Sequence, residues 1–166
     1  MGDVRSMGLA ADERTLIRQL YPPLQRFAAV VAPADVDPED LVQDAFLRVI
    51  RRGSLSNLEH PKAYLRKTVC NLASNSRRKF SRQRRAMIKL GGVEIKMPHY
   101  PSDLEDLLRL SPMARAVLYL REVEGRTFAE IGALLGKTEA GVRSIASRAR
   151  RQLRAELIEE VRSATA

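Results

Sequence analysis

The feature that most constrains the fold is a series of helix start and stop signals between residues 111 and 154. Ser111 and the proline after it have the pattern of an N-cap residue and a first helical residue, and Gly125 ends that segment. Thr127 and Glu130 are spaced as a capping box, in which side chains satisfy backbone N–H groups at a helix start. Short helices in close succession are therefore expected in this part of the chain.

A third helix is predicted directly after these two. Gly136 is a stop signal for the second helix, and Thr138 can cap the next one. Two short helices joined by a three-residue turn, the second of them basic, have the spacing of a helix-turn-helix. On a helical wheel, the apolar side of this third helix consists of Val142, Ile145, Ala146, Ala149 and Leu153.

The opposite side of this third helix has a composition suited to the major groove of DNA. Small residues beside an arginine let a helix enter the groove, where arginine pairs with guanine and alanine or serine contacts the thymine methyl. Arginines further along would meet phosphates. The alternative is a solvated face, but solvated faces usually mix charges, and no acidic residue lies between Glu139 and Glu156. This side carries Ala140, Arg143, Ser144, Ser147, Arg151 and Arg154.

Apolar residues in the first half of the chain also recur at helical spacing. The stripe over residues 16–31 contains Pro22 and Pro23, so a kink or a restart of the helix is expected there. Asp37, followed by proline, predicts the start of a second helix, and Pro61 predicts the start of a third. Aromatic residues are scarce, which suits helices packed by aliphatic side chains. We therefore predict an all-α fold of two small helical domains joined by a flexible linker.

The composition changes between residues 91 and 102, where two glycines and two prolines occur without a helical stripe. We interpret this segment as the linker between a first domain over residues 10–90 and a second over residues 103–160. The alternative is an internal loop of a single domain. Just before this segment, residues 77–85 contain six basic residues in nine.

The charge balance indicates a polyanionic partner. The chain has 29 basic and 20 acidic residues, a formal net charge of +9, which favours nucleic acid or an acidic membrane surface. Cys70 is the only cysteine, so neither an intramolecular disulfide nor a cysteine-based zinc site is possible, and no cofactor or metal is expected. No apolar run approaches a membrane span and the N-terminus lacks a signal-peptide core, so we expect a cytoplasmic protein.

Three segments, in a fixed order, resemble parts of one protein family. Residues 37–50, DPEDLVQDAFLRVI, and residues 60–79, HPKAYLRKTVCNLASNSRRK, resemble region two of bacterial sigma factors and the promoter-melting segment that follows it. Residues 110–154 resemble region four. Two domains without a middle one are the arrangement of the extracytoplasmic-function (ECF, group IV) sigma factors. The resemblance implies a factor that binds core RNA polymerase, recognises and opens promoters, and is not itself an enzyme.

The resemblance also implies roles for three groups of side chains. The helix over residues 37–50 is expected to dock on the coiled coil of the polymerase β′ subunit, and the side chains expected to bind polymerase are Gln43, Asp44, Leu47, Arg48 and Arg51. The β flap of polymerase is a further expected contact of the factor. The promoter −10 element is expected to contact Asn57, Tyr64, Arg66, Lys67, Asn71, Asn75, Arg77 and Arg78. The −35 element is expected to contact Ala140, Arg143, Ser144, Ser147, Arg148 and Arg151. Of these, Tyr64 lies on an apolar stripe and fits a core position better, as does Cys70 nearby.

Other functions stay open at this point. A stand-alone helix-turn-helix regulator would bind duplex DNA tightly without polymerase. A sigma-like decoy would bind an anti-sigma protein, which is an expected partner of a sigma factor as well. An enzyme acting on nucleic acid has little support, because His60 and His99 are far apart and no acidic cluster suggests a metal site.

Overall fold

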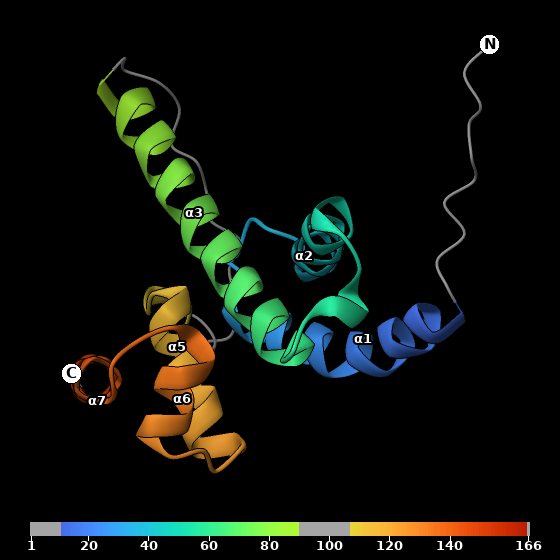
Figure 1. Cartoon of the computed structure of the whole chain (residues 1–166). Helices are drawn as coiled ribbons and strands as arrows, with labels where there is room; N and C mark the ends of the chain where they lie inside the picture. Colours follow the sequence, from blue (N-terminus) through green and yellow to red (C-terminus); the bar gives the residue numbers. More distant parts are fainter. Residues whose placement is uncertain (1–10, 90–106, 166) are drawn as a thin grey trace.

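The computed structural model of the chain describes residues 11–89 and 107–165 (Figure 1). Within these ranges every regular element is a helix and none is a strand, which confirms the prediction of an all-helical fold. The predicted linker over residues 91–102 and His99 within it lie outside the described residues.

The first half of the chain forms three helices and one short turn of 3-10 helix. These are α1 (Ala11–Val31), α2 (Pro38–Arg52), η1 (Leu55–Asn57) and α3 (Pro61–Lys89). The predicted start of α2 is confirmed, because the Asp37 carboxylate accepts a hydrogen bond of 2.8 Å from the backbone N–H of Glu39. This contact satisfies one of the N–H groups that a helix start leaves unpaired.

Helix α1 runs through Pro22 and Pro23 as one element of 21 residues, so the restart expected at the prolines does not occur. Each proline lacks the N–H that a helix interior needs. The residues that follow, Leu24, Phe27 and Val31, are all buried. Burial of this apolar stripe offsets the hydrogen bonds that the prolines cannot make.

The second half forms α5 (Pro112–Leu118), a π-helical turn η2 (Tyr119–Val123), α6 (Phe128–Leu135) and α7 (Glu139–Ala164). Its predicted caps are confirmed. The Ser111 hydroxyl accepts from Ala114 N–H at 3.1 Å, and Thr127 and Glu130 form the capping box. Gly136 ends α6 with a φ of 67°, a left-handed conformation that glycine adopts at little cost.

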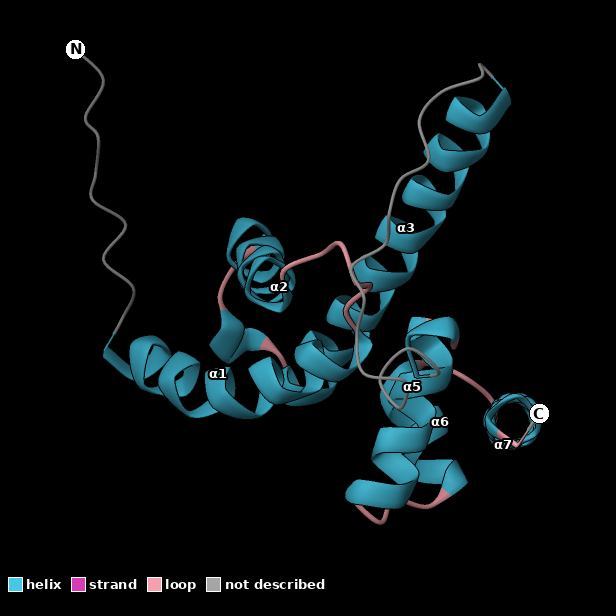
Figure 2. Cartoon of the chain, turned by 180° about the vertical axis from the view of Figure 1, so that it is seen from behind, coloured by secondary structure: helices cyan, strands magenta, loops and turns pink. Residues whose placement is uncertain are grey.

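The two halves pack against each other and share one cluster of buried apolar side chains. In Figures 1 and 2, α5 and α6 lie beside the N-terminal part of α3, while the other end of α3 extends away from the body. The ring of Phe27 in α1 meets the ring of Tyr119 edge to face at 6.1 Å. The Arg115 side chain from α5 donates to the carbonyls of Ala32 and Val31, at 2.9 and 3.1 Å, where α1 ends.

Candidate nucleic-acid interface

Helix α7 has one side in the core and one side open, as the sequence predicts. Val142, Ala146 and Ala149 are buried, whereas Ile145 and Leu153 are half-buried. All six side chains expected at the −35 element are exposed, and we call them the outer face of α7: Ala140, Arg143, Ser144, Ser147, Arg148 and Arg151. This is the arrangement that a groove-reading helix needs.

Arg143, near the N-terminal end of this face, has two partners in the second half. Its Nη2 donates to Glu139 Oε1 at 2.6 Å, one helical turn earlier, and its guanidinium lies 5.3 Å from the centre of the Phe128 ring. This pairing was not predicted from the sequence. Both partners of the ion pair are exposed, and exposed pairs contribute little to stability, so Arg143 can exchange Glu139 for DNA.

An open hollow of about 490 Å³ lies further along α7 and is lined mainly by arginine. Its lining consists of Ser147, Arg150, Arg151 and Arg154. Arg150 is already engaged, because its Nη2 donates to Glu122 Oε1 at 2.5 Å. Arg151 and Arg154 form no ion pair with another described residue, so their charge is available to phosphates.

Helix α3 has a strongly basic surface. Its 29 residues contain no aspartate or glutamate. Four of the side chains expected at the −10 element are exposed at spacings of three or four residues, which places them on one side of the helix. We call them the exposed stripe of α3: Lys67, Asn71, Asn75 and Arg78.

A second hollow, of about 280 Å³, lies between the end of α2, the η1 loop and the start of α3. Asn57 is exposed at this hollow, and Tyr64 is half-buried there and packs against the core cluster. The Tyr64 hydroxyl accepts a hydrogen bond of 3.0 Å from Arg52 Nη1. Amide, hydroxyl and aromatic groups on a basic scaffold suit an unpaired base. We call this the loop hollow, lined by Val49, Arg52, Gly53, Ser54, Asn57, Leu58 and Tyr64.

The loop beside this hollow is held in place by Glu13, a role that was not predicted from the sequence. The Glu13 carboxylate accepts hydrogen bonds from Ser54 Oγ at 2.9 Å and from the Leu55 N–H at 2.7 Å. Glu13 and Leu55 are both buried. The local sequence pattern does not predict these hydrogen bonds, because acidic residues are common in the first turn of a helix for electrostatic reasons alone.

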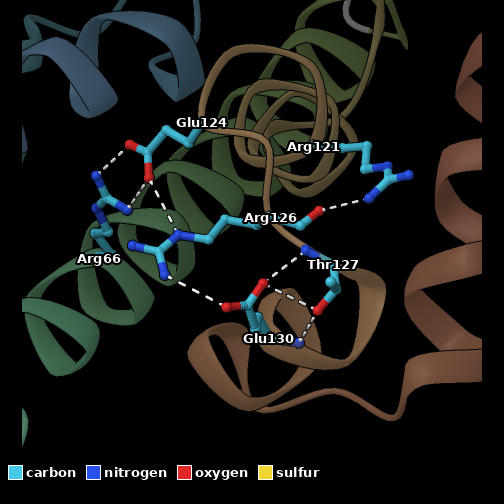
Figure 3. Close-up of polar contacts among 6 residues, drawn as sticks. All are labelled: Arg66, Arg121, Glu124, Arg126, Thr127 and Glu130. Atoms are coloured by element: carbon cyan, nitrogen blue, oxygen red, sulfur yellow. Dashed lines mark hydrogen bonds and ion pairs between the residues drawn. The ribbon is translucent and has the colours of Figure 1, made fainter.

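Arg66, expected at the −10 element, is only 2% exposed. Its Nη1 donates to Glu124 Oε2 at 2.8 Å and its Nη2 donates to Glu124 Oε1 (Figure 3). Its guanidinium lies 5.3 Å from the centre of the Phe27 ring. The hydrogen bond from Arg66 holds the pKa of Glu124 below its ordinary value. Arg66 therefore differs from the exposed stripe, because in this arrangement its guanidinium is occupied by the second half of the chain.

The outward side of α2 carries all five side chains expected to contact polymerase. They are exposed and lie opposite the buried side of the helix: Gln43, Asp44, Leu47, Arg48 and Arg51. Leu47 is 46% exposed and is the apolar member of this otherwise polar group. Protein interfaces commonly have an apolar centre and a polar rim, and Leu47 with its polar neighbours has this arrangement. Its role in binding polymerase stays a prediction.

Two further findings concern the described residues as a whole. They contain no group of three or more histidine, cysteine, aspartate or glutamate residues placed to hold a metal ion. None of the described helices has the length and apolar character needed to cross a membrane. Cys70 is buried, and burial raises the pKa of its thiol to about 12, as expected for a packing residue.

The fold and these surfaces define a class of protein. A helix-turn-helix with an open arginine-rich face, and a second basic helix beside a hollow suited to a base, are features of a DNA-binding protein with two reading elements. Family comparison agrees: residues 16–85 match sigma-70 region 2, and residues 107–155 match sigma-70 region 4. Both matches lie inside the domains predicted from the sequence.

Similar proteins support the same family. The chain is 31% identical to an RNA polymerase sigma-E factor of Streptomyces coelicolor, over 92% of this chain and 89% of that protein. It is 30% identical to the ECF RNA polymerase sigma factor SigE of Mycolicibacterium smegmatis, over 84% of this chain and 59% of that protein. The chain belongs to the ECF sigma factors of the sigma-70 family.

A solved structure shares the fold. The sigma factor RpoE from Bartonella quintana, crystallised in complex with the anti-sigma factor NepR, superposes with a TM-score of 0.65 at 23% sequence identity. The match covers 89% of this chain and 98% of that one.

Proposed function

We propose that this sigma factor divides promoter recognition among three separate surfaces. The outward side of α2 binds core RNA polymerase, the outer face of α7 reads the −35 duplex, and the loop hollow with the exposed stripe of α3 binds the −10 strand. The observation that carries the proposal is that the surfaces of α2 and α7, the loop hollow and the exposed stripe of α3 are all accessible in one chain that matches both sigma regions.

The two DNA surfaces use different physical means. Arginine and small side chains on α7 suit the edges of paired bases in a major groove. The loop hollow offers the amide of Asn57 and the ring of Tyr64, which suit a base that has left the duplex. Capture of unpaired bases, together with polymerase contacts, supplies the free energy of promoter melting. The factor itself catalyses no bond chemistry and acts in the cytoplasm.

An anti-sigma protein is the proposed regulator of this chain. The support is that the similar structure of RpoE was determined with the anti-sigma factor NepR bound. Such a partner would control how much of the factor is available to polymerase.

Run-off transcription with purified core polymerase tests the proposal. Addition of the chain to a panel of candidate promoters is expected to produce new start sites. Leu47→Ala should remove these starts and reduce co-purification with core polymerase, because it truncates the apolar centre of the α2 surface. Gln25→Ala, at an exposed position on α1, is the matched control and should behave as the unaltered protein.

Other outcomes would point to other functions. Specific repression by the chain alone, with no new starts, would indicate a stand-alone regulator. Binding to an anti-sigma protein without binding to core polymerase would indicate a decoy. Either result would contradict the proposal.

A further inference from the structure

Glu13 is buried although it lies in the first turn of a helix, where acidic residues are usually exposed. Its exposed fraction is 7%, whereas Asp12, its neighbour in the same turn of α1, is exposed. An acidic residue that stabilises a helix start by its charge alone has no need of burial. A buried carboxylate is costly unless its oxygens accept hydrogen bonds. Glu13 therefore has a role beyond its charge, and its hydrogen-bond donors show what that role is.

The donors to Glu13 come from the loop that joins α2 to α3. In Figures 1 and 2 this loop lies beside α1. Glu13 Oε1 accepts from Ser54 Oγ at 2.9 Å and from the Leu55 N–H at 2.7 Å. A hydroxyl has one hydrogen, so Ser54, which donates it to Glu13, accepts from the Ser56 hydroxyl at 2.6 Å and from the Ser56 N–H at 3.2 Å. The carboxylate thus orients both the backbone and the hydroxyls at the start of η1.

The rest of the loop transmits this orientation to Asn57. The Ser54 carbonyl accepts from the Asn57 N–H at 3.2 Å, and the Leu55 side chain is fully buried. Gly53, directly before Ser54, has a φ of 145°, a conformation that favours glycine. A Cβ built on Gly53 would be 3.9 Å from Asn57 Nδ2, so the side-chain amide lies close to the end of α2. This amide forms no hydrogen bond with any other described residue, so its donors and its acceptor are available in the loop hollow.

An amide in a fixed orientation discriminates between bases better than a mobile one. A mobile amide can turn to match the hydrogen-bonding edge of any base, whereas a fixed amide leaves the wrong base with unpaired groups, which costs free energy. A loop that is already ordered also loses less conformational entropy when it binds a ligand. The contribution of Glu13 is therefore expected in the preference among bases more than in the affinity for DNA in general.

We propose that Glu13 is a positioning residue for −10 recognition. Through Ser54 and Leu55 it holds the η1 loop so that Asn57 presents its amide to a captured base in one orientation, while Glu13 itself, being buried, does not contact the base. The inference rests on the proposed function for the identity of the ligand, a base of the −10 strand. The tether between α1 and the loop is a property of the chain and can be measured without DNA.

Hydrogen exchange of the free full-length protein measures the tether. In Glu13→Ala the Leu55 N–H loses its acceptor, so exchange in residues 53–58 should become about tenfold faster or more. Asp12→Ala is the matched control, because it removes an exposed acidic residue from the same helical turn, and it should exchange as the unaltered protein does. Exchange in α6, in the other half of the chain, should be the same in all three proteins. Equal exchange of the loop in Glu13→Ala and in the control would overturn the proposal.

Binding of −10 oligonucleotides to the complex of the factor with core polymerase measures the consequence for recognition. The single-stranded oligonucleotides come from a promoter that the unaltered factor transcribes, and they differ by single bases. The position read by the loop hollow is the one at which Asn57→Ala changes the preference among bases. At that position Glu13→Ala should reduce the ratio of affinities for the best and the worst base by about threefold or more. A purely structural role would weaken binding to all bases alike, so an unchanged ratio would overturn the proposal.

Three further variants separate the position of the carboxylate from its charge. Glu13→Asp keeps the charge but is one methylene shorter, so it should relax the preference as Glu13→Ala does, and it replaces Glu13→Ala if that variant fails to fold. Glu13→Gln keeps the length and an oxygen acceptor, so it should retain the preference. Glu13→Ala combined with Asn57→Ala should show the preference of Asn57→Ala alone, because Glu13 acts through Asn57. Retention in Glu13→Asp, loss in Glu13→Gln or a further loss in the double variant would contradict the proposal.

The positioning role and the proposed function fail in different ways. If Asn57→Ala changes the preference at no position, the assignment of the loop hollow to the −10 strand is wrong and the positioning role falls with it, whereas faster exchange at Leu55 would still establish the tether. If Asn57→Ala changes the preference and Glu13→Ala does not, the loop hollow keeps its proposed function and the positioning role of Glu13 is wrong.

Discussion

Helices α3 and α7 are both basic, and both are expected to bind promoter DNA. They differ in how far their basic side chains are exposed and in which part of the chain supplies their acidic partners. The outer face of α7 is exposed along its length, and its acidic partner for Arg143 is one turn away on the same helix. Helix α3 has no acidic residue of its own, and the carboxylate that holds Arg66 comes from 58 residues later in the chain. The basic side chains on the outer face of α7 are exposed to solvent, whereas Arg66 of α3 is bound by a carboxylate from the other half of the chain.

This difference concerns which side chains are accessible. The outer face of α7 is exposed in the structure as it stands. For Arg66 of α3 to bind a DNA phosphate, its hydrogen bonds to Glu124 must first be lost.

The largest effect is expected from a substitution in the buried core, to which both halves of the chain contribute. Phe27 contacts both Tyr119 and Arg66, so Phe27→Ala should lower the free energy of unfolding by about 3–5 kcal/mol. Urea unfolding followed by circular dichroism should show one transition for both halves. Leu157→Ala, at an exposed position late in α7, is the control and should change little. Two separate transitions, of which only one responds to Phe27→Ala, would contradict a shared core.

The next largest effect is expected at the outer face of α7. Arg143→Ala should weaken binding to duplex −35 DNA by about 1–3 kcal/mol and relax the sequence preference, as expected when a base contact of arginine is lost. Arg151→Ala should instead weaken binding to all sequences alike and reduce the salt dependence by about one phosphate contact. Fluorescence anisotropy at several salt concentrations measures both, with Arg150→Ala as the control because Arg150 is paired with Glu122. Equal loss of sequence preference in all three variants would contradict the assignment.

A smaller effect is expected at the loop hollow. Asn57→Ala removes an exposed amide that can hydrogen-bond a captured base, so affinity for a single-stranded −10 oligonucleotide should fall by about 0.5–1.5 kcal/mol. Both affinities are measured for the complex of the factor with core polymerase, and the affinity of the Asn57→Ala complex for duplex −35 DNA should be unchanged. Gln19→Ala, which also removes an exposed amide but on α1, should have no effect on either. Loss of duplex affinity in Asn57→Ala would mean that the two surfaces are not independent.

The smallest effect concerns pH. The pKa of Glu124 is lowered in the folded protein by the hydrogen bond from Arg66, so the ionised Glu124 stabilises the contact between the two halves above its ordinary pKa of 4.5. This contribution is lost as the pH falls through the lowered value. Urea unfolding at neutral and at acidic pH should therefore show a larger loss of stability in the unaltered protein than in Glu124→Ala. Glu122→Ala should follow the unaltered protein. The same pH dependence in all three proteins would show that the ionised Glu124 does not hold the interface.

The helices and their caps could be predicted from the sequence because their signals are local. Asp37, Ser111 and Thr127 cap the helices that follow them, and the apolar side of α7 is the buried one. Helix α7 was predictable because it packs on one side only, so a helical wheel separates core from surface.

The other features depend on residues distant in the chain. Helix α3 has partners on two sides, so Arg66 is buried where its charge alone favours the surface. The tie between Glu13 and Leu55 spans 42 residues. The continuity of α1 through its prolines likewise depends on tertiary burial. In each case packing between elements outweighs the local preference.

The central claim, that α7 reads the −35 element within an initiating complex, is tested most directly by run-off transcription in a two-by-two design. A promoter found with the unaltered factor is compared with a version whose −35 element is scrambled, each with the unaltered factor and with Arg143→Ala. If Arg143 acts through that element, Arg143→Ala should lower transcription from the intact promoter towards the level of the scrambled one and have little further effect on the scrambled one. An equal loss on both promoters, or no loss on either, would contradict the claim.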